Sequence, residues 1–103
     1  MRVLIVAKLD SEVGNELISS GEMGPKLAQL LDDLKPEAAY FMPQGRRTMH
    51  LIVNLEDPAQ LVTFLEPLWL VTKAEVEVLP VMIPEDLQRG MQQLSARRQK
   101  DRG

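Results

Sequence analysis

FMPQGRRTMHLIVNLEDP, residues 41–58, is the stretch that decides the fold. Proline, a polar residue and glycine at 43–45 are typical of a three-residue hairpin loop whose glycine is left-handed. An apolar run rich in Leu, Ile and Val follows, and it ends at Asp57-Pro58, where aspartate caps a helix and proline fits its first turn. The stretch therefore predicts a β-hairpin followed directly by a helix.

The loop length predicts the pairing of the two strands. A loop of residues 43–45 places Met42 opposite Arg46, Tyr40 opposite Thr48 and Ala38 opposite His50. Because side chains alternate along a strand and opposed partners share a face, the hairpin has two distinct sides. One side carries Phe41, Met49, Leu51, Val53 and Leu55, and the other carries Tyr40, Arg46, Thr48, His50, Ile52 and Asn54.

The segments on either side of this hairpin complete the fold. Val3–Leu9 is a short β-branched strand, and the apolar spacing from Val13 to Leu34 is helical, with a bend or break near Gly21–Pro25. A helix follows Asp57-Pro58, kinked or restarted at Pro67; a strand covers Glu75–Ile83; a last helix begins at Pro84. This order predicts an α+β, ferredoxin-like split βαβ fold, with a four-stranded antiparallel sheet, helices on one face and an added C-terminal helix. We expect one domain, with residues 1–84 forming the ferredoxin-like part and 85–103 its C-terminal helix and basic tail.

Composition excludes several classes of function. The chain has 103 residues, no cysteine and a net charge of −3, so we expect no disulfide, thiolate metal site or catalytic thiol. From Gln88 onward five basic residues stand against one acidic residue, whereas the residues before it include seven basic and fourteen acidic ones. An acidic body repels phosphate, so we expect no nucleic-acid partner. Apolar runs are too short for a signal peptide or a membrane span, and we expect a cytoplasmic protein without a membrane partner.

The second face of the sheet predicts self-association. With both helices on one side, the other side would leave Ile52, Tyr40, Leu79 and Val81 exposed to water. Apolar patches of this kind on a monomer generally mark an interface. Two-fold dimers are the commonest soluble oligomers, so we expect a homodimer packed sheet to sheet, with a cavity between the sheets.

Four stretches also carry a resemblance to known proteins: LKPEAAYF, GRRTMHLIVNLEDPAQL, EPLWL and AEVEVLPVMIPEDL. They resemble a family of small uncharacterised bacterial proteins, some of which are labelled pantothenate synthetase. The chain is similar to the dimeric α+β barrel superfamily of muconolactone isomerases, antibiotic-biosynthesis monooxygenases and YciI-like proteins. This resemblance implies a dimeric barrel but no particular activity. The synthetase label does not fit, because the chain has no glycine-rich phosphate loop.

The polar residues of the second face are the candidate site. His50 and Tyr40 are the candidate catalytic groups, since imidazole and phenol can both exchange protons with a ligand. Thr48, Asn54 and Arg46 are the candidate ligand-binding groups, and Arg46 could instead form a hairpin-end ion pair with Glu75 or Glu77. One histidine and no cysteine predict neither a metal site nor another cofactor.

The sequence thus favours a protein that binds a small apolar or aromatic molecule between the sheets of a homodimer, without a prosthetic group. Whether the molecule is also turned over is left open by these residues. The alternative is a structural or regulatory dimerisation module whose interface is filled by side chains. A cavity lined by Tyr40 and His50 favours the first interpretation, and a close-packed interface favours the second.

Overall fold

The computed structural model describes residues 1–102, which form an antiparallel sheet and four helices. The elements are β1 (Arg2–Lys8), α1 (Ser11–Ser20), α2 (Met23–Leu34), β2 (Ala38–Pro43), β3 (Arg47–Asn54), α3 (Gln60–Thr72), β4 (Glu75–Pro80) and α4 (Pro84–Arg102). The strands lie in the order β2-β3-β1-β4, and all neighbours are antiparallel. The predicted α+β class and four-stranded antiparallel sheet are confirmed.

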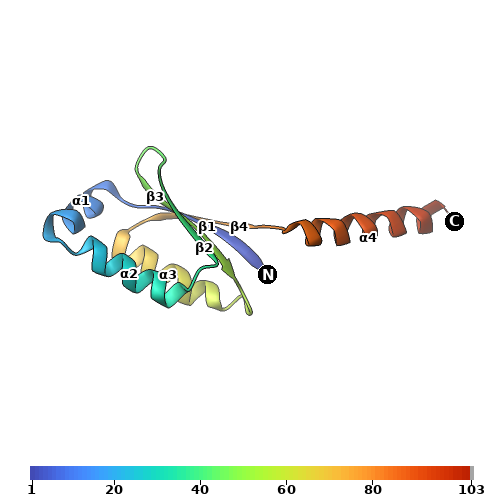
Figure 1. Ribbon diagram of the computed structural model, residues 1–103, viewed down its shortest axis with the longest axis horizontal. Coiled ribbons are helices and arrows are strands. Elements are labelled where there is room, and N and C mark those ends of the chain that lie inside the picture. The colour runs from blue at the N-terminus through green and yellow to red at the C-terminus, as the bar shows by residue number, and fades with distance from the viewer. Residues whose placement is uncertain (103) are drawn as a thin grey trace.

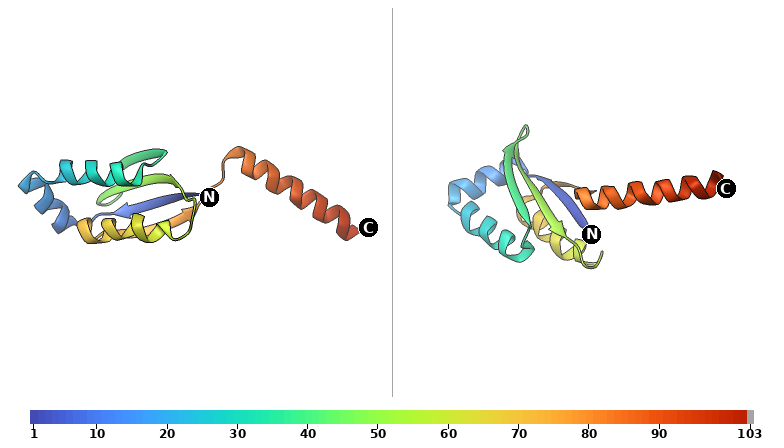
Figure 2. Two further views of the ribbon diagram at one scale, coloured as in Figure 1. Left: turned by 90° about the horizontal axis from the view of Figure 1, so that it is seen from below. Right: turned by 45° about the vertical axis from the view of Figure 1, so that its right-hand side comes forward.

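The helices differ in how they relate to this sheet. Helices α2 and α3 pack against one face, and α1 lies at the end of the sheet next to the tip of the β2–β3 hairpin (Figure 1). Helix α4 leaves the opposite end and points away from the body in every view (Figure 2). The molecule is therefore elongated, with extents of 67 × 27 × 18 Å.

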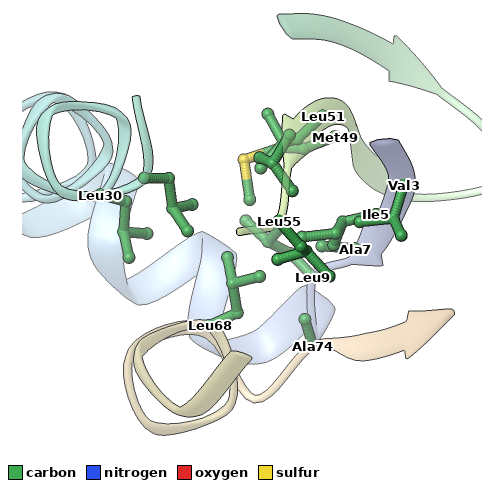
Figure 3. Packing of buried hydrophobic residues seen from close by; sticks show 12 residues of the cluster. Val3, Ile5, Ala7, Leu9, Leu30, Met49, Leu51, Leu55, Leu68 and Ala74 are labelled. Atoms are coloured by element: carbon green, nitrogen blue, oxygen red, sulfur yellow. The ribbon is translucent and has the colours of Figure 1, made fainter. Parts of the chain in front are cut away.

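The core lies between the sheet and helices α2 and α3. Its strand residues alternate along β1 and β3, as expected for one face of a pleated sheet. Leu30 of α2 and Leu68 of α3 close over them (Figure 3). The buried cluster consists of Val3, Ile5, Ala7, Leu9, Leu30, Leu34, Met49, Leu51, Val53, Leu55, Leu68 and Ala74. This is the apolar side predicted for the hairpin strand.

The helical region before β2 is divided into two helices. Asp10 begins α1, because its Oδ2 accepts a hydrogen bond from the Val13 amide at 3.1 Å. Gly21 ends α1 with φ of 78°, a left-handed conformation that glycine adopts without steric cost. Helix α2 starts two residues later and has Pro25 in its first turn. The predicted break near Gly21–Pro25 is thus a helix–helix junction.

The start of α3 combines the predicted cap with a tighter first turn. The Asp57 side chain accepts from the Ala59 amide at 2.9 Å, and the Gln60 side chain accepts from the Asp57 amide at 3.2 Å. The Gln60 bond is the returning half of a capping box, whereas the Asp57 side chain bonds the amide two residues on instead of the one three residues on. The amides of residues 60–62 donate to the carbonyls three residues earlier, which is the hydrogen-bond pattern of a 3₁₀ turn. The α-helix itself starts at Gln60 rather than at Pro58. The helix then runs through Pro67 without a restart.

The hairpin register differs from the prediction by two residues. Tyr40 pairs with His50, and Pro43 pairs with Arg47, so the loop is residues 44–46. Proline can end this strand because β2 is an edge strand, where its missing amide hydrogen costs no ladder bond. A shift of two residues keeps every side chain on its predicted face, because the strand period is two.

The last strand is shorter than predicted, and the last helix begins at Pro84 as predicted. Strand β4 ends at Pro80, earlier than the predicted Ile83, and residues 81–83 connect it to α4. Among the helices of residues 1–102, none has both the length and the apolar character needed to cross a bilayer.

Candidate functional site

The face of the sheet opposite α2 and α3, called here the open face, carries the candidate residues predicted from the sequence. Its side chains form three rows across β2, β3, β1 and β4, as the strand pairing defines them. The rows are Ala38–Ile52–Leu4–Leu79, Tyr40–His50–Val6–Glu77 and Met42–Thr48–Lys8–Glu75. An apolar row therefore lies beside a mixed row and a polar row.

Tyr40 and His50 are direct cross-strand neighbours on this face. Tyr40 is 65% exposed, so its phenol is free to meet a ligand or a partner. His50 is half-buried, and its Nε2 lies 3.2 Å from Oε1 of Gln44 in the hairpin loop. Gln44 is thus the hydrogen-bonding partner of the imidazole within the chain.

The three predicted ligand-binding residues are engaged within the chain. The Arg46 guanidinium forms an ion pair of 2.7 Å with Glu75, one of the two partners considered from the sequence. Thr48 is 3% exposed, and its hydroxyl donates to the Arg46 carbonyl at 2.9 Å. Asn54 lies at the far end of β3, where its Oδ1 accepts from the Met1 amino group at 3.3 Å. The open face thus brings Tyr40 and His50 together and leaves Asn54 apart.

The structure has a second candidate site on the other side of the hairpin. A groove of about 780 Å³ lies between helices α1 and α2 and the β2–β3 hairpin. Its lining is mainly apolar, with polar groups from β3 and the start of α1. The residues are Leu9, Ser11, Ile18, Met23, Leu27, Phe41, Met42, Pro43, Gly45, Arg46, Arg47, Thr48 and Met49.

Two of these apolar side chains are unusually accessible. Ile18 is 54% exposed and Phe41 is 55% exposed. Both line the groove, so a molecule seated there would remove both from water. Burial of apolar surface is the main favourable term in binding of this kind.

Arg47 supplies the charge of the groove. Its guanidinium nitrogens Nη1 and Nη2 both donate to the Asn15 side-chain oxygen at 3.2 Å. That partner is a neutral amide, so the contact leaves the positive charge of the guanidinium uncompensated. Gly14 makes the contact possible, because a Cβ at this position would lie 2.7 Å from Nη1. The arginine therefore rests on the backbone of α1 at the edge of an apolar groove.

The sequence did not single out this groove, although it identified two of its residues. Arg46 of the hairpin loop and Thr48 of β3 line it, whereas Tyr40, His50 and Asn54 do not. Strand alternation puts the Arg47 side chain on the helical side of the sheet, the side opposite to that predicted for Arg46. The alternation does not predict where α1 lies, because that depends on the helix–helix junction at Gly21.

The groups with shifted pKa values lie at the other end of the sheet. Glu37 accepts from Arg2 Nε at 2.9 Å and thereby raises the pKa of that arginine above its ordinary value. Asp86 accepts from the Ile83 amide at 3.2 Å and from Arg89, and both bonds lower the pKa of its carboxyl group. The Asp86 contacts lie at the start of α4, the Arg2–Glu37 pair joins β1 to the residue before β2, and neither belongs to a candidate site.

Side chains that could ligate a metal are dispersed over the described part of the chain. No three His, Cys, Asp or Glu side chains in residues 1–102 come together in the way metal ligands do. The geometry of the groove and of the open face is therefore the basis for a functional assignment. No family model, curated protein or solved structure matches the chain.

Proposed function

We propose that this protein binds a small, largely apolar molecule that carries an anionic group, and that it does so as a homodimer. The observation that carries the proposal is the groove between α1, α2 and the hairpin. Its volume of about 780 Å³ falls within the roughly 300–1,000 Å³ of ligand pockets. An apolar wall with one uncompensated guanidinium suits a molecule with an apolar body and a carboxylate or sulfonate.

The orientation of such a ligand follows from the polar end of the groove. Arginine presents a planar fork of donors that matches a carboxylate. The anionic group would replace Asn15 as the partner of Arg47 or share the guanidinium with it. The apolar body would then lie along Ile18 and Phe41, which the ligand would cover.

A dye with this chemistry tests the groove. We expect 8-anilinonaphthalene-1-sulfonate to bind the full chain saturably, with increased fluorescence, and Arg47→Met to weaken its affinity about tenfold or more, as expected for a lost charge-assisted bond. Arg89→Met is the matched control, because it removes the same charge from α4, far from the groove. Equal affinities of the wild type and Arg47→Met would contradict the assignment of the anion to Arg47.

A second pair of variants tests the apolar wall. Ile18→Asp puts a negative charge into the groove and should abolish dye binding, because it both repels the anion and removes apolar surface. Val62→Asp is the matched control: Val62 is 63% exposed on α3 and does not line the groove. If both variants bind the dye as the wild type does, the groove is not the binding site.

The dimer is proposed from the open face. The strand order β2-β3-β1-β4, with its intervening helices, supports a ferredoxin-like arrangement and membership of the dimeric α+β barrel superfamily. Leu79 is 45% exposed and Tyr40 is 65% exposed on this face. Packing two copies sheet to sheet would cover Tyr40 and the whole apolar row that ends at Leu79.

The space between two paired sheets is the second candidate location for the ligand. Tyr40 and His50 are adjacent there, and sparse polar groups in an apolar enclosure orient small ligands. His50→Ala distinguishes the two locations. Dye binding that is lost in His50→Ala and retained in Ile18→Asp would place the molecule between the sheets, whereas the opposite pattern places it in the groove.

A further inference from the structure

Helix α4 is a long helix that the rest of the described chain leaves uncovered. It spans Pro84–Arg102 and projects from the end of the sheet (Figures 1 and 2). Every residue from Leu87 to Asp101 is exposed. A single helix has little stability in water without tertiary packing, and Gly90 lowers it further. A packing partner is therefore needed to keep this helix ordered.

One side of α4 has the pattern of a helix–helix contact. Leu87, Met91 and Leu94 are separated by four and three residues, which places them on one stripe. They are 52%, 55% and 42% exposed, respectively. Beside them lies a shallow hollow lined by Gln88, Met91, Gln92, Ser95, Ala96 and Gln99.

The charges of α4 favour only one orientation of two such helices packed through this stripe. Its first turn carries Glu85 and Asp86, and its last turns carry Arg97, Arg98 and Lys100. Two parallel helices would bring the basic ends together, and the like charges would repel each other. Two antiparallel helices would instead bring the acidic start of each beside the basic end of the other.

We infer that α4 pairs with α4 of a second copy in an antiparallel arrangement, with the two-fold axis at Met91. The seam is then symmetric: Met91 meets the same residue of the second copy, and Leu87 lies within one residue of Leu94 along the axis, about 1.5 Å. The acidic first turn of each helix is level with Arg97 of the other. The inference is independent of the groove and of the open face. A chain that also dimerises through its open face would form a tetramer of two such dimers.

A second copy fits α4 better than other occupants do. A phosphate-bearing surface, such as a nucleic acid or an anionic membrane, would attract the basic end but repel the acidic first turn. The apolar stripe is also only three residues long, which is less than the broad apolar face of a membrane-bound helix. The self-complementary charge pattern is what selects the second copy.

Cysteine cross-linking tests the arrangement directly, because the natural chain has no cysteine. A disulfide requires Cα atoms within about 7 Å of each other. Met91→Cys should therefore give a disulfide-linked dimer under mild oxidation. Leu87→Cys alone should not, since two copies of this position lie about 12 Å apart along an antiparallel pair at 1.5 Å per residue. An equimolar mixture of Leu87→Cys and Leu94→Cys should give the mixed dimer.

The controls separate this result from random collision and from the open-face dimer. Gln99→Cys is also exposed but far from the two-fold axis, and it should cross-link at least tenfold more slowly than Met91→Cys. The Met91→Cys product should form at the same rate when Ile52→Lys is added to the open face. Efficient self-linking of Leu87→Cys would show a parallel pair, and absence of a Met91→Cys product above the Gln99→Cys level would show no pair. Either result overturns the inference.

Discussion

Single residues determine how the hairpin turns. Gly45 has φ of 80°, a value that costs an L-residue with a Cβ about 1–2 kcal/mol. Its Cβ position is open to solvent, with nothing within 4 Å, so the cost of a substitution there comes from the backbone alone. The loop also contains Gln44, whose side chain meets His50. The conformation of one glycine thus affects both the hairpin and the histidine.

Gly45→Ala should lower the free energy of unfolding by about 1 kcal/mol, because alanine is strained at a positive φ. Gly90→Ala is the matched control, since that site is also open but lies within a helix. Urea denaturation followed by the fluorescence of Trp69 would measure both. An unchanged midpoint for Gly45→Ala would mean that the loop adopts another conformation.

The stability of α4 should depend on pH through the carboxyl group of Asp86. Its pKa in the folded chain is lowered, first by the bond from the Ile83 amide and then by Arg89. A lowered folded pKa means stability that is present above the unfolded value, about 3.9, and lost as pH falls through the folded value. The helical circular dichroism signal should therefore decrease below about pH 4. Asp86→Asn should show a smaller decrease over the same range, and an identical decrease would exclude Asp86 as the cause.

At the scale of elements, three helices end at a residue whose backbone conformation is left-handed. Gly21 ends α1, whereas Lys35 and Lys73 end α2 and α3 with φ of 44° and 48°. Each of these residues closes its helix by a backbone hydrogen bond to a carbonyl of the last turn. Glycine is the residue that usually takes this position. Two of the helices therefore end with a residue that is strained where it stands.

Lys73→Gly should raise the free energy of unfolding by about 0.5–1 kcal/mol, since relief of the positive φ exceeds the added entropy of glycine in the unfolded chain. Lys26→Gly, an exposed helical position in α2, should do the opposite, because glycine destabilises a helix interior. Thermal unfolding of the two variants provides the comparison. A lower melting temperature for Lys73→Gly would indicate that the lysine side chain contributes more than its backbone costs.

On the scale of the whole molecule, three surfaces have no partner within the described chain: the open face, the groove and the stripe on α4. They lie on different parts of the elongated body, so their partners can be tested one at a time. The open face offers the widest contact, because it extends across all four strands. Sheet-to-sheet association through it should be the stronger of the two self-contacts.

Ile52→Lys should therefore dissociate the open-face dimer, because it places a charge without a partner in an apolar contact. Light scattering at micromolar concentration would report a lower mass, and an unchanged circular dichroism spectrum would show that the fold is retained. Val62→Lys, on the exposed side of α3, should leave the mass unchanged. A wild type that is monomeric at these concentrations would contradict the dimer itself.

The order and type of the elements, and the two faces of the sheet, could be read from the sequence alone. The reason is that alternation is local: side chains point to opposite faces along a strand whatever its partner. Tyr40 and His50 were thus predicted to share a face, and they do, although the pairing of Tyr40 with Thr48 was wrong. The error of two residues arose because Pro43 continues β2 instead of belonging to the loop.

The groove and the isolation of α4 were decided only by the tertiary structure. Arg47 becomes a groove residue because α1 places Gly14 and Asn15 against it, more than thirty positions away in sequence. Helix α4 was predicted as a helix from Pro84 onward, but the sequence did not show whether that helix packs on its own sheet or elsewhere. Such contacts depend on how separate elements are oriented in space. Local periodicity determines which face of an element is apolar, and only the arrangement of all the elements determines what, if anything, covers that face.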